Sequence, residues 1–390
     1  MVSPYRTMTI TKVILEDYRS HRHTELALGP LTVLVGPNGC GKTSVLEAIN
    51  GLCALPGVRS QAAFGHADPP PAIDDVNVRA GASSWSIAIE GLGKAGAWQL
   101  KFGGEPRGEH RGRYASWRLG EREGRGNGSN NPTLPVRALW KTLPLDGALP
   151  TSQLLRLSRE NLTRPSTLEV SERLPELAPD GSGLPAVFGW MKLARDRQYR
   201  SVVEMVRRVV PRVRGVSVRE KTFTEERLYW HGPEDAPSPE PRRVTLNGFE
   251  VVFEMADGAV VPARAASEGT LVTLGLAVAL NVDPLPSMVL IDDVERSLHP
   301  RGQRELMGAI RELQTARPEV QIAVTTHSPF VVDEVEASSV VVMAQREDGS
   351  TAGHRLPEHP KASRLLQQLT NGEFLGVIGE DWVAQEPVRG

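Results

Sequence analysis

The sequence predicts an α/β fold in which a mixed β-sheet is flanked by helices and interrupted by an inserted lobe. Three apolar runs, at residues 31–35, 288–291 and 321–326, predict parallel strands that are buried on both faces. The first run leads into a glycine-rich loop and a helix, the second ends in two aspartates, and the third ends in a histidine. Ligands of open α/β sheets bind at the carboxyl ends of such strands, so these polar residues predict one shared site.

The composition excludes several classes of protein. The chain has 390 residues, and its 45 Lys and Arg against 47 Asp and Glu give a net charge of −2, which excludes a global basic field. Cys40 lies in the glycine-rich loop and Cys53 about three helical turns further on, so the two cysteines predict no disulfide. The longest apolar stretch, 271–280, is too short for a bilayer, and the N-terminus has no signal-peptide pattern. We expect a cytoplasmic protein without a membrane partner.

Residues 36–43 fit the phosphate-binding pattern Gly-x-x-x-x-Gly-Lys-Thr in its required strand–loop–helix context. Glycines allow successive backbone N–H groups to turn toward phosphates, and the following helix N-terminus adds a positive dipole end. Lys42 is expected to reach the β- and γ-phosphates, and the Thr43 hydroxyl to take a Mg²⁺ position. The predicted ATP-binding residues here are Gly36, Pro37, Asn38, Gly39, Cys40, Gly41, Lys42, Thr43 and Ser44.

The two other buried strands supply acids and a histidine. Asp292 is expected to bind Mg²⁺, directly or through water, and the carboxylate that follows it to orient the attacking water. His327 ends the strand at 321–326, where it is expected to contact the γ-phosphate. Many buried strands end in Asp, so this pattern alone does not indicate a Mg²⁺ site. The phosphate loop upstream makes a Mg²⁺ site the favoured interpretation.

A third motif, Ser267-Glu268-Gly269-Thr270, precedes the apolar helix expected at 271–280. Ser267 is a good helix N-cap, which would explain it structurally. The same geometry, a hydroxyl and free N–H groups, also makes an anion site. Such a site would lie away from its own phosphate loop and would bind the nucleotide of another chain.

The chain is expected to divide into three segments. Residues 1–100 form the first part of the ATPase head and a β-rich arm, residues 101–240 a mainly helical inserted lobe, and residues 241–390 the second part of the head. Within the lobe, 103–134 predicts a solvated segment, with a DNA-contacting arginine strip as the alternative. Short strands are expected at 243–246 and 250–254.

Together these motifs resemble the ATP-binding-cassette (ABC) ATPases, and more narrowly their RecF-like and OLD-like branch, common among anti-phage defence ATPases. The resemblance extends from Ile10 to about Trp382. Its motifs are the opening strand (14–20), Walker A (36–43), the signature (267–270), Walker B (291–295), the turn after it (297–300) and the switch histidine (326–329), with further similarity at 179–184 and 371–374.

The resemblance implies a head-to-tail homodimer, or a higher homo-oligomer, with two ATP molecules between the heads. Each ATP would contact the Walker loops of one chain and Ser267 and Gly269 of the other. Gln61 is the candidate Q-loop ligand of Mg²⁺. The chain departs from the family in having Asp293 where Glu is usual, which implies slow hydrolysis. Asp293 is the favoured catalytic residue and Glu295 the second candidate.

The predicted function is an ATP-hydrolysing sensor and scaffold of a bacterial anti-phage defence system that controls a separate nuclease or toxic effector. About sixty residues follow His327, so we expect no nuclease domain of the OLD type in this chain. The alternative is a RecF-like DNA-repair or DNA-maintenance ATPase that binds DNA in the ATP state. An inactive pseudo-ATPase stays open as an alternative because of Asp293. The ATPase subunit of a transporter is disfavoured, because the signature lacks the second glycine and the glutamine that are usual in transporters.

Overall fold

The computed structural model describes residues 9–53, 84–93, 96–105, 112–128, 150–168, 175–231 and 238–385. The chain forms two compact units, the first made of residues 1–155 and 284–390 and the second of residues 156–283. These divisions differ from the expected ones at 100/101 and 240/241, because the β-rich residues after 100 pair with the first unit's sheet and the signature helix packs within the second unit.

The first unit contains an antiparallel six-stranded sheet with the order β2-β1-β4-β5-β6-β7. Its strands are β1 (Thr9–Tyr18), β2 (His21–Ala27), β4 (Trp85–Gly93), β5 (Gly96–Glu105), β6 (Gly112–Leu119) and β7 (Arg122–Gly128). The solvated segment expected at 103–134 is wrong for 112–128, which form β6, β7 and the turn between them. There the alternate residues Trp117 and Leu119 are buried in the core. The Trp117 ring occupies the space that a side chain at position 124 would need, so Gly124 is required there.

A second six-stranded sheet of the first unit has the order β15-β14-β3-β13-β12-β8. Its strands are β3 (Leu31–Val35), β8 (Ser152–Leu155), β12 (Met288–Ile291), β13 (Gln321–Thr326), β14 (Val340–Gln345) and β15 (Thr351–Arg355). Strands β3, β12 and β13 run parallel and every residue in them is buried, as their apolar sequences predict.

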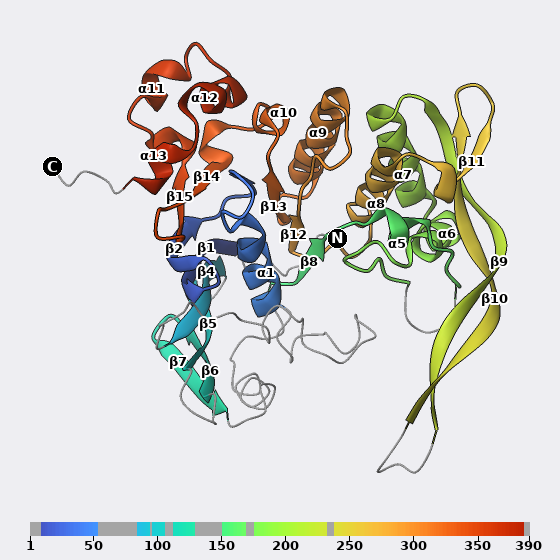
Figure 1. The fold of residues 1–390 in the computed structure, drawn as a ribbon, viewed down its shortest axis with the longest axis horizontal. Helices are drawn as coiled ribbons and strands as arrows, with labels where there is room; N and C mark the ends of the chain where they lie inside the picture. Colours follow the sequence, from blue (N-terminus) through green and yellow to red (C-terminus); the bar gives the residue numbers. More distant parts are fainter. Residues whose placement is uncertain are drawn as a thin grey trace. The chain divides into compact units, whose positions relative to one another are not determined.

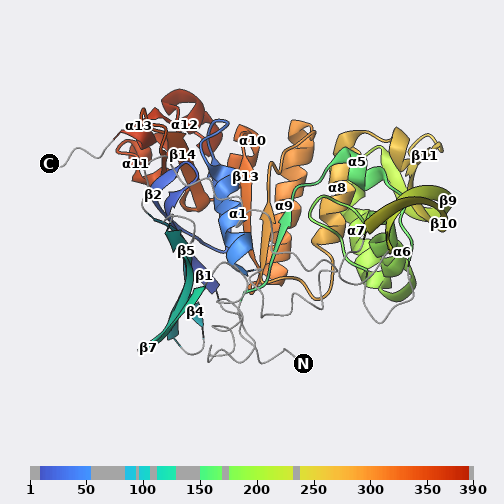
Figure 2. The same cartoon turned by 60° about the horizontal axis from the view of Figure 1, so that its bottom comes forward.

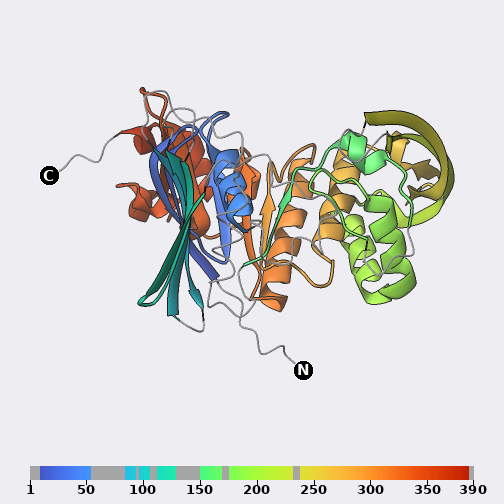
Figure 3. The ribbon, with the colours of Figure 1, turned by 90° about the horizontal axis from the view of Figure 1, so that it is seen from below.

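Helix α1 (Lys42–Cys53) lies between the two sheets, and the core of the unit combines its apolar residues with those of both sheets (Figures 2 and 3). The remaining helices of the unit are α9 (Pro300–Ala316), α10 (Pro329–Val332), α11 (Ala362–Leu365), α12 (Asn371–Ile378) and α13 (Asp381–Ala384). Short 3₁₀ turns at Ala337–Ser339 and Leu356–Glu358 complete it.

In its described residues, the second unit combines four helices with a three-stranded sheet of order β11-β10-β9, in which β9 and β10 form a long ribbon (Figure 1). Its elements are α5 (Arg159–Thr163), α6 (Leu184–Ala194), α7 (Asp196–Val209), β9 (Val213–His231), β10 (Ser238–Met255), β11 (Val260–Pro262), a 3₁₀ turn (Ala263–Ala265) and α8 (Glu268–Ala279). Helix α8 is buried on all sides from Gly269 onward, so it forms the centre of this unit's core.

The two short strands expected at 243–246 and 250–254 are one continuous strand, β10. Asn247-Gly248 is typical of a turn, yet Gly248 pairs with Lys221 inside the ladder. The glycine is needed because the backbone of Ser166 passes beside it. A Cβ atom at position 248 would lie 2.5 Å from the Ser166 carbonyl oxygen.

Candidate nucleotide-binding site

The candidate site lies at the carboxyl ends of three neighbouring parallel strands, β3, β13 and β12. The phosphate loop follows β3, His327 follows β13, and Asp292 follows β12. The sheet therefore brings together residues that are 249 and 285 positions apart in the chain, as the hydrogen bonds of Thr43 and Lys42 show.

Two glycines of the loop are required by close backbone approaches. A Cβ at Gly36 would lie 2.1 Å from the Met343 carbonyl oxygen, and one at Gly41 would lie 2.7 Å from both His21 Nε2 and Thr351 Oγ1. Both residues have positive φ, 155° and 93°, which L side chains rarely adopt. The loop is therefore packed between β14 on one side and the first residues of β2 and β15 on the other.

The loop presents free backbone donors. Among the described residues, the amide N–H groups of Asn38, Gly39 and Gly41 make no hydrogen bond, and Asn38 and Gly39 are exposed. Helix α1 begins at Lys42, so its first N–H groups also lack intrahelical acceptors. This set of unpaired donors fits a polyphosphate, for which such helix N-termini are ready-made sites.

The Lys42 ammonium group makes three hydrogen bonds. Its Nζ atom donates to the carbonyl oxygens of Gly36 at 2.8 Å and Pro37 at 3.0 Å, and it lies 3.1 Å from His327 Nε2. Because an ammonium group only donates, His327 Nε2 is the acceptor in this contact. Cys40 Sγ lies 3.9 Å from the same nitrogen, and burial raises the pKa of the Cys40 thiol.

A hydroxyl–carboxylate cluster lies beside the lysine. Thr43 Oγ1 donates to Asp292 Oδ1 and Oδ2 at 2.9 and 3.1 Å, and Thr325 Oγ1 donates to Asp292 Oδ1 at 2.7 Å. Thr325 also accepts from the Asp293 amide at 2.8 Å. The sequence analysis missed Thr325, although its place near the end of a buried strand beside the acidic strand was a usable signal.

The two candidate catalytic carboxylates have different surroundings. Asp293 is exposed and follows the end of β12. Its backbone has the left-handed conformation, with a φ of 52°. Glu295 Oε1 accepts a hydrogen bond from the backbone N–H of His327 at 2.6 Å. The structure therefore brings Glu295 to the backbone of His327 and leaves Asp293 facing solvent.

Two residues of the β1–β2 turn also reach the loop, and sequence reasoning missed both. Arg19, with a φ of 54°, forms an ion pair with Glu47 of α1 and approaches Ser44 Oγ at 3.4 Å. His21 is fully buried, with Nε2 3.2 Å from the Gly41 carbonyl oxygen. Burial lowers the pKa of His21 to about 4, against the opposing effect of that hydrogen bond.

The signature residues lie in the second unit. Ser267 is the N-cap of α8, where its hydroxyl accepts from the Thr270 amide at 3.2 Å. Ser267 is exposed, whereas Gly269 and Thr270 are buried. The third expected Mg²⁺ ligand, Gln61, lies outside the described residues.

Among the described residues, no cluster of three or more His, Cys, Asp or Glu side chains suits a metal ion. No helix in the described ranges combines the length and the apolar character needed to cross a bilayer.

Known structures share this fold. The chain resembles an Smc head domain bound to the C-winged helix domain of ScpA, with a TM-score of 0.55 and 16% identity over 91% of this chain and 99% of that one. It also resembles the Smc head domain of Pyrococcus furiosus bound to the C-terminal domain of ScpA, with a TM-score of 0.52 and 16% identity over 93% and 99%. The expected mixed α/β fold of an ABC-type ATPase head is thereby confirmed.

Sequence comparisons lead to the same class. DNA replication and repair protein RecF of Erwinia tasmaniensis is 54% identical over 43 residues, and that of Cronobacter sakazakii is 51% identical over 43. These matches cover 11% of this chain and 12% of each relative, so the chain aligns with about an eighth of their length. The fold and site define an ABC-type P-loop ATPase.

A family model matches residues 31–333. This range includes the phosphate loop, the signature, and the ends of the strands that precede Asp292 and His327. Its description is "AAA domain, putative AbiEii toxin, Type IV TA system". The chain belongs to this family.

Proposed function

We propose that the chain is the ATP-gated sensor and scaffold of a bacterial defence system and controls a separate nuclease or toxic effector. In this proposal two chains dimerise around two ATP molecules and separate after hydrolysis. The observation that supports it best is the convergence of Lys42, Thr43, Asp292 and His327 at one edge of the sheet. The family description, which names a toxin, supports the defence context.

The residues present fit ATP with Mg²⁺. The free loop amides suit phosphate oxygens, and the Thr43 hydroxyl beside the Asp292 carboxylate offers the few oxygen ligands that Mg²⁺ takes from protein. When bound, ATP with Mg²⁺ supplies the phosphoanhydride whose cleavage releases the dimer. Lys42 then exchanges its contacts with the Gly36 and Pro37 carbonyls for phosphate oxygens.

Each remaining residue has a distinct role in this proposal. Asp293 holds the attacking water, and its short, exposed side chain makes turnover slow. Glu295 holds the backbone of the switch loop, which positions His327 for the terminal phosphate. Ser267 and Gly269 bind the nucleotide of the partner subunit at the start of α8, where Ser267 is exposed. Slow hydrolysis suits a switch better than a pump.

A pull-down from the native host tests the effector. The bait is tagged Asp293→Asn with ATP and Mg²⁺ present, which is expected to keep the dimer closed, and the control bait is Lys42→Ala. Stoichiometric recovery of a nuclease or toxin-like protein by the first bait alone supports the proposal. Recovery of replication or recombination proteins with DNA, and no effector, contradicts it.

The second candidate function is a RecF-like ATPase of DNA repair or maintenance. The 43-residue segment that is 54% identical to RecF favours this candidate. In that case the ATP-bound dimer would bind DNA. DNA-stimulated ATP hydrolysis would not separate the two functions, because a defence sensor can also bind DNA, so the recovered partner decides.

A further inference from the structure

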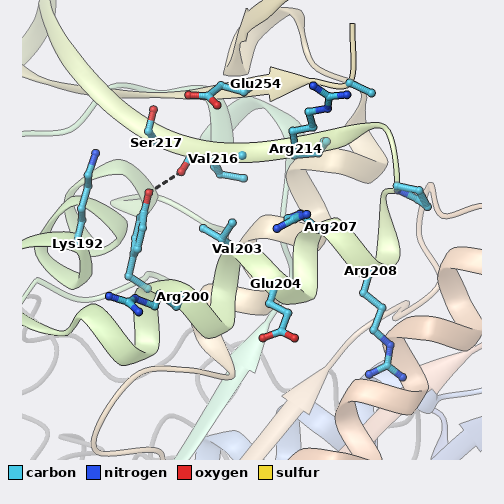
Figure 4. Close-up of a pocket in the computed structure, with 15 residues that line it drawn as sticks. Lys192, Arg200, Val203, Glu204, Arg207, Arg208, Arg214, Val216, Ser217 and Glu254 are labelled. Carbon is cyan, nitrogen blue, oxygen red and sulfur yellow. Dashed lines mark hydrogen bonds between the residues drawn. The ribbon is translucent and has the colours of Figure 1, made fainter. Parts of the chain in front are cut away.

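The second unit contains a basic cleft between α7 and the start of β9 (Figure 4). Its volume is about 1120 Å³. Five cationic side chains and two carboxylates line it, which gives the lining a formal charge of +3 in a chain whose net charge is −2. The charged residues are Lys192, Arg200, Arg207, Arg208, Arg214, Glu204 and Glu254.

The cleft is built into the fold. Helix α7 buries Val202, Met205, Val206 and Val209 on one face, so the residues between them, including Arg200 and Arg207, face outward. A tight connection follows the helix, in which the Val213 amide donates to the Val210 carbonyl at 3.0 Å. Arg214 is therefore placed across the cleft from Arg207 (Figure 4).

Tyr199 holds the two walls together. Its hydroxyl donates to the Val216 carbonyl of β9 at 2.8 Å, and its ring stacks on Phe188 of α6 with the centroids 5.0 Å apart. Because its hydroxyl and one ring face are occupied, Tyr199 fixes the spacing of α7 and β9.

Within the described part of the chain, two of the cations have no partner of opposite charge. Arg207 and Arg214 form no ion pair with any described residue, and both are exposed. Arg200 pairs with Asp196 at 2.6 Å, but this is an exposed helical pair, which contributes little and is easily exchanged. Glu204 follows Arg200 by one turn of α7, and Glu254 lies against Gly215, so both acids moderate the field without neutralising it.

The lining indicates what kind of partner fits. A protein interface is anchored by large apolar or aromatic side chains. None of the exposed large hydrophobic residues of the described chain lines this cleft. Arginine forks bind phosphate oxygens in bidentate fashion, and Arg200 and Arg207 stand about 10 Å apart along the helix axis. A duplex presents about one negative charge per 1.7 Å of its axis, so a span of this length faces several phosphates.

We infer that this cleft binds the phosphate backbone of a double-stranded nucleic acid, with Arg207 and Arg214 as the principal contacts. The cleft needs neither bound nucleotide nor an effector, so the inference stands independently of the proposed function. Because these contacts go to phosphates and not to base edges, binding is expected to depend on salt and not on sequence.

The test is fluorescence anisotropy of the full-length chain with short labelled DNA and RNA duplexes and a matched single strand. Wild type is expected to bind a duplex, with an affinity that falls steeply between about 50 and 200 mM salt. Arg207→Glu combined with Arg214→Glu is expected to weaken binding at least tenfold and to lower the salt slope by about 2. Arg207→Lys with Arg214→Lys keeps the charge and should retain most of the affinity.

The matched control is Lys361→Glu with Arg364→Glu, an equal charge reversal on an exposed helix of the first unit. It is expected to leave duplex binding within about twofold of wild type. Unchanged thermal unfolding and ATP binding by the cleft variant establish that it folds. Three results would overturn the inference: no duplex binding by wild type, tighter binding of the single strand than of the duplex, or equal affinity of wild type and the cleft variant. The relative affinities of the DNA and RNA duplexes identify which nucleic acid is the natural ligand.

Discussion

The carboxylate of Glu295 accepts a hydrogen bond from the backbone N–H of His327 at 2.6 Å, although the two residues are 32 positions apart. This bond joins the loop after β12 to the loop after β13 at the edge of the sheet. It uses one oxygen of Glu295 to hold a backbone, whereas Asp293 is exposed. The geometry therefore supports different roles for the two candidate catalytic acids.

Substitution of each acid by its amide separates these roles. Asp293→Asn is expected to lower ATP turnover about a hundredfold or more while preserving ATP affinity, because a positioned base contributes a factor of that order. Glu295→Gln keeps an oxygen that accepts from the His327 amide, so its turnover should stay within about tenfold of wild type. Single-turnover hydrolysis measures both. The reverse order of effects would move the catalytic role to Glu295.

Thr325 is expected to be essential for the geometry of Asp292. Its buried hydroxyl donates to Asp292 and accepts from the Asp293 amide, so Thr325→Val leaves two polar groups without this partner. The variant should lose about 1–3 kcal/mol of stability and require more Mg²⁺ for activity. Denaturant unfolding and a Mg²⁺ titration of hydrolysis check this. The exposed Thr315→Val is the control, and equal behaviour of the two variants would refute the role of Thr325.

Ser267 is expected to act between two chains. Ser267→Arg places a long side chain at the exposed start of α8, which should block ATP-dependent dimerisation and leave ATP binding by the monomer intact. Light scattering with and without ATP measures the first property, and calorimetry the second. Thr370→Arg changes another exposed N-cap, that of α12, and controls for loss of a cap. Dimers of Ser267→Arg with ATP would contradict the proposed contact in trans.

His21 is expected to make stability depend on pH. Its folded pKa of about 4 lies below the ordinary value of 6.5, so between these values the unfolded chain binds a proton that the folded chain does not. The stability contributed by the neutral, buried ring is complete above pH 6.5 and is lost as the pH falls toward 4, by up to about 3 kcal/mol. Urea unfolding of wild type and His21→Gln at several pH values tests this. Parallel pH profiles would exclude His21 as the cause.

The sequence predicted the parts of the site that depend on local patterns. The strand–loop–helix order around Lys42 and the apolar strands before Asp292 and His327 are local features, and the structure brings them to one edge. The contacts of Thr325, Arg19 and His21 depend on which strands become neighbours. A buried threonine or histidine has no periodic signature, so these residues could not be identified before the topology was known.

The errors in the fold have physical causes too. Residues 112–128 contain many charged and glycine residues, yet pairing with β5 and the burial of Trp117 make them strands. Asn247-Gly248 resembles a turn, but its glycine accommodates the close backbone of Ser166. In both places a neighbour that is distant in sequence overrides the local preference.

The central claim is that Lys42 and its loop bind ATP. Isothermal titration of ATP with Mg²⁺ into wild type and Lys42→Ala tests this claim most directly, with Lys361→Ala as an exposed-lysine control. Wild type and the control are expected to bind one ATP per chain. Lys42→Ala should bind about a hundredfold more weakly or not at all, because a charge-assisted contact to phosphate is lost. Unchanged ATP affinity of Lys42→Ala would contradict the assignment of the nucleotide site.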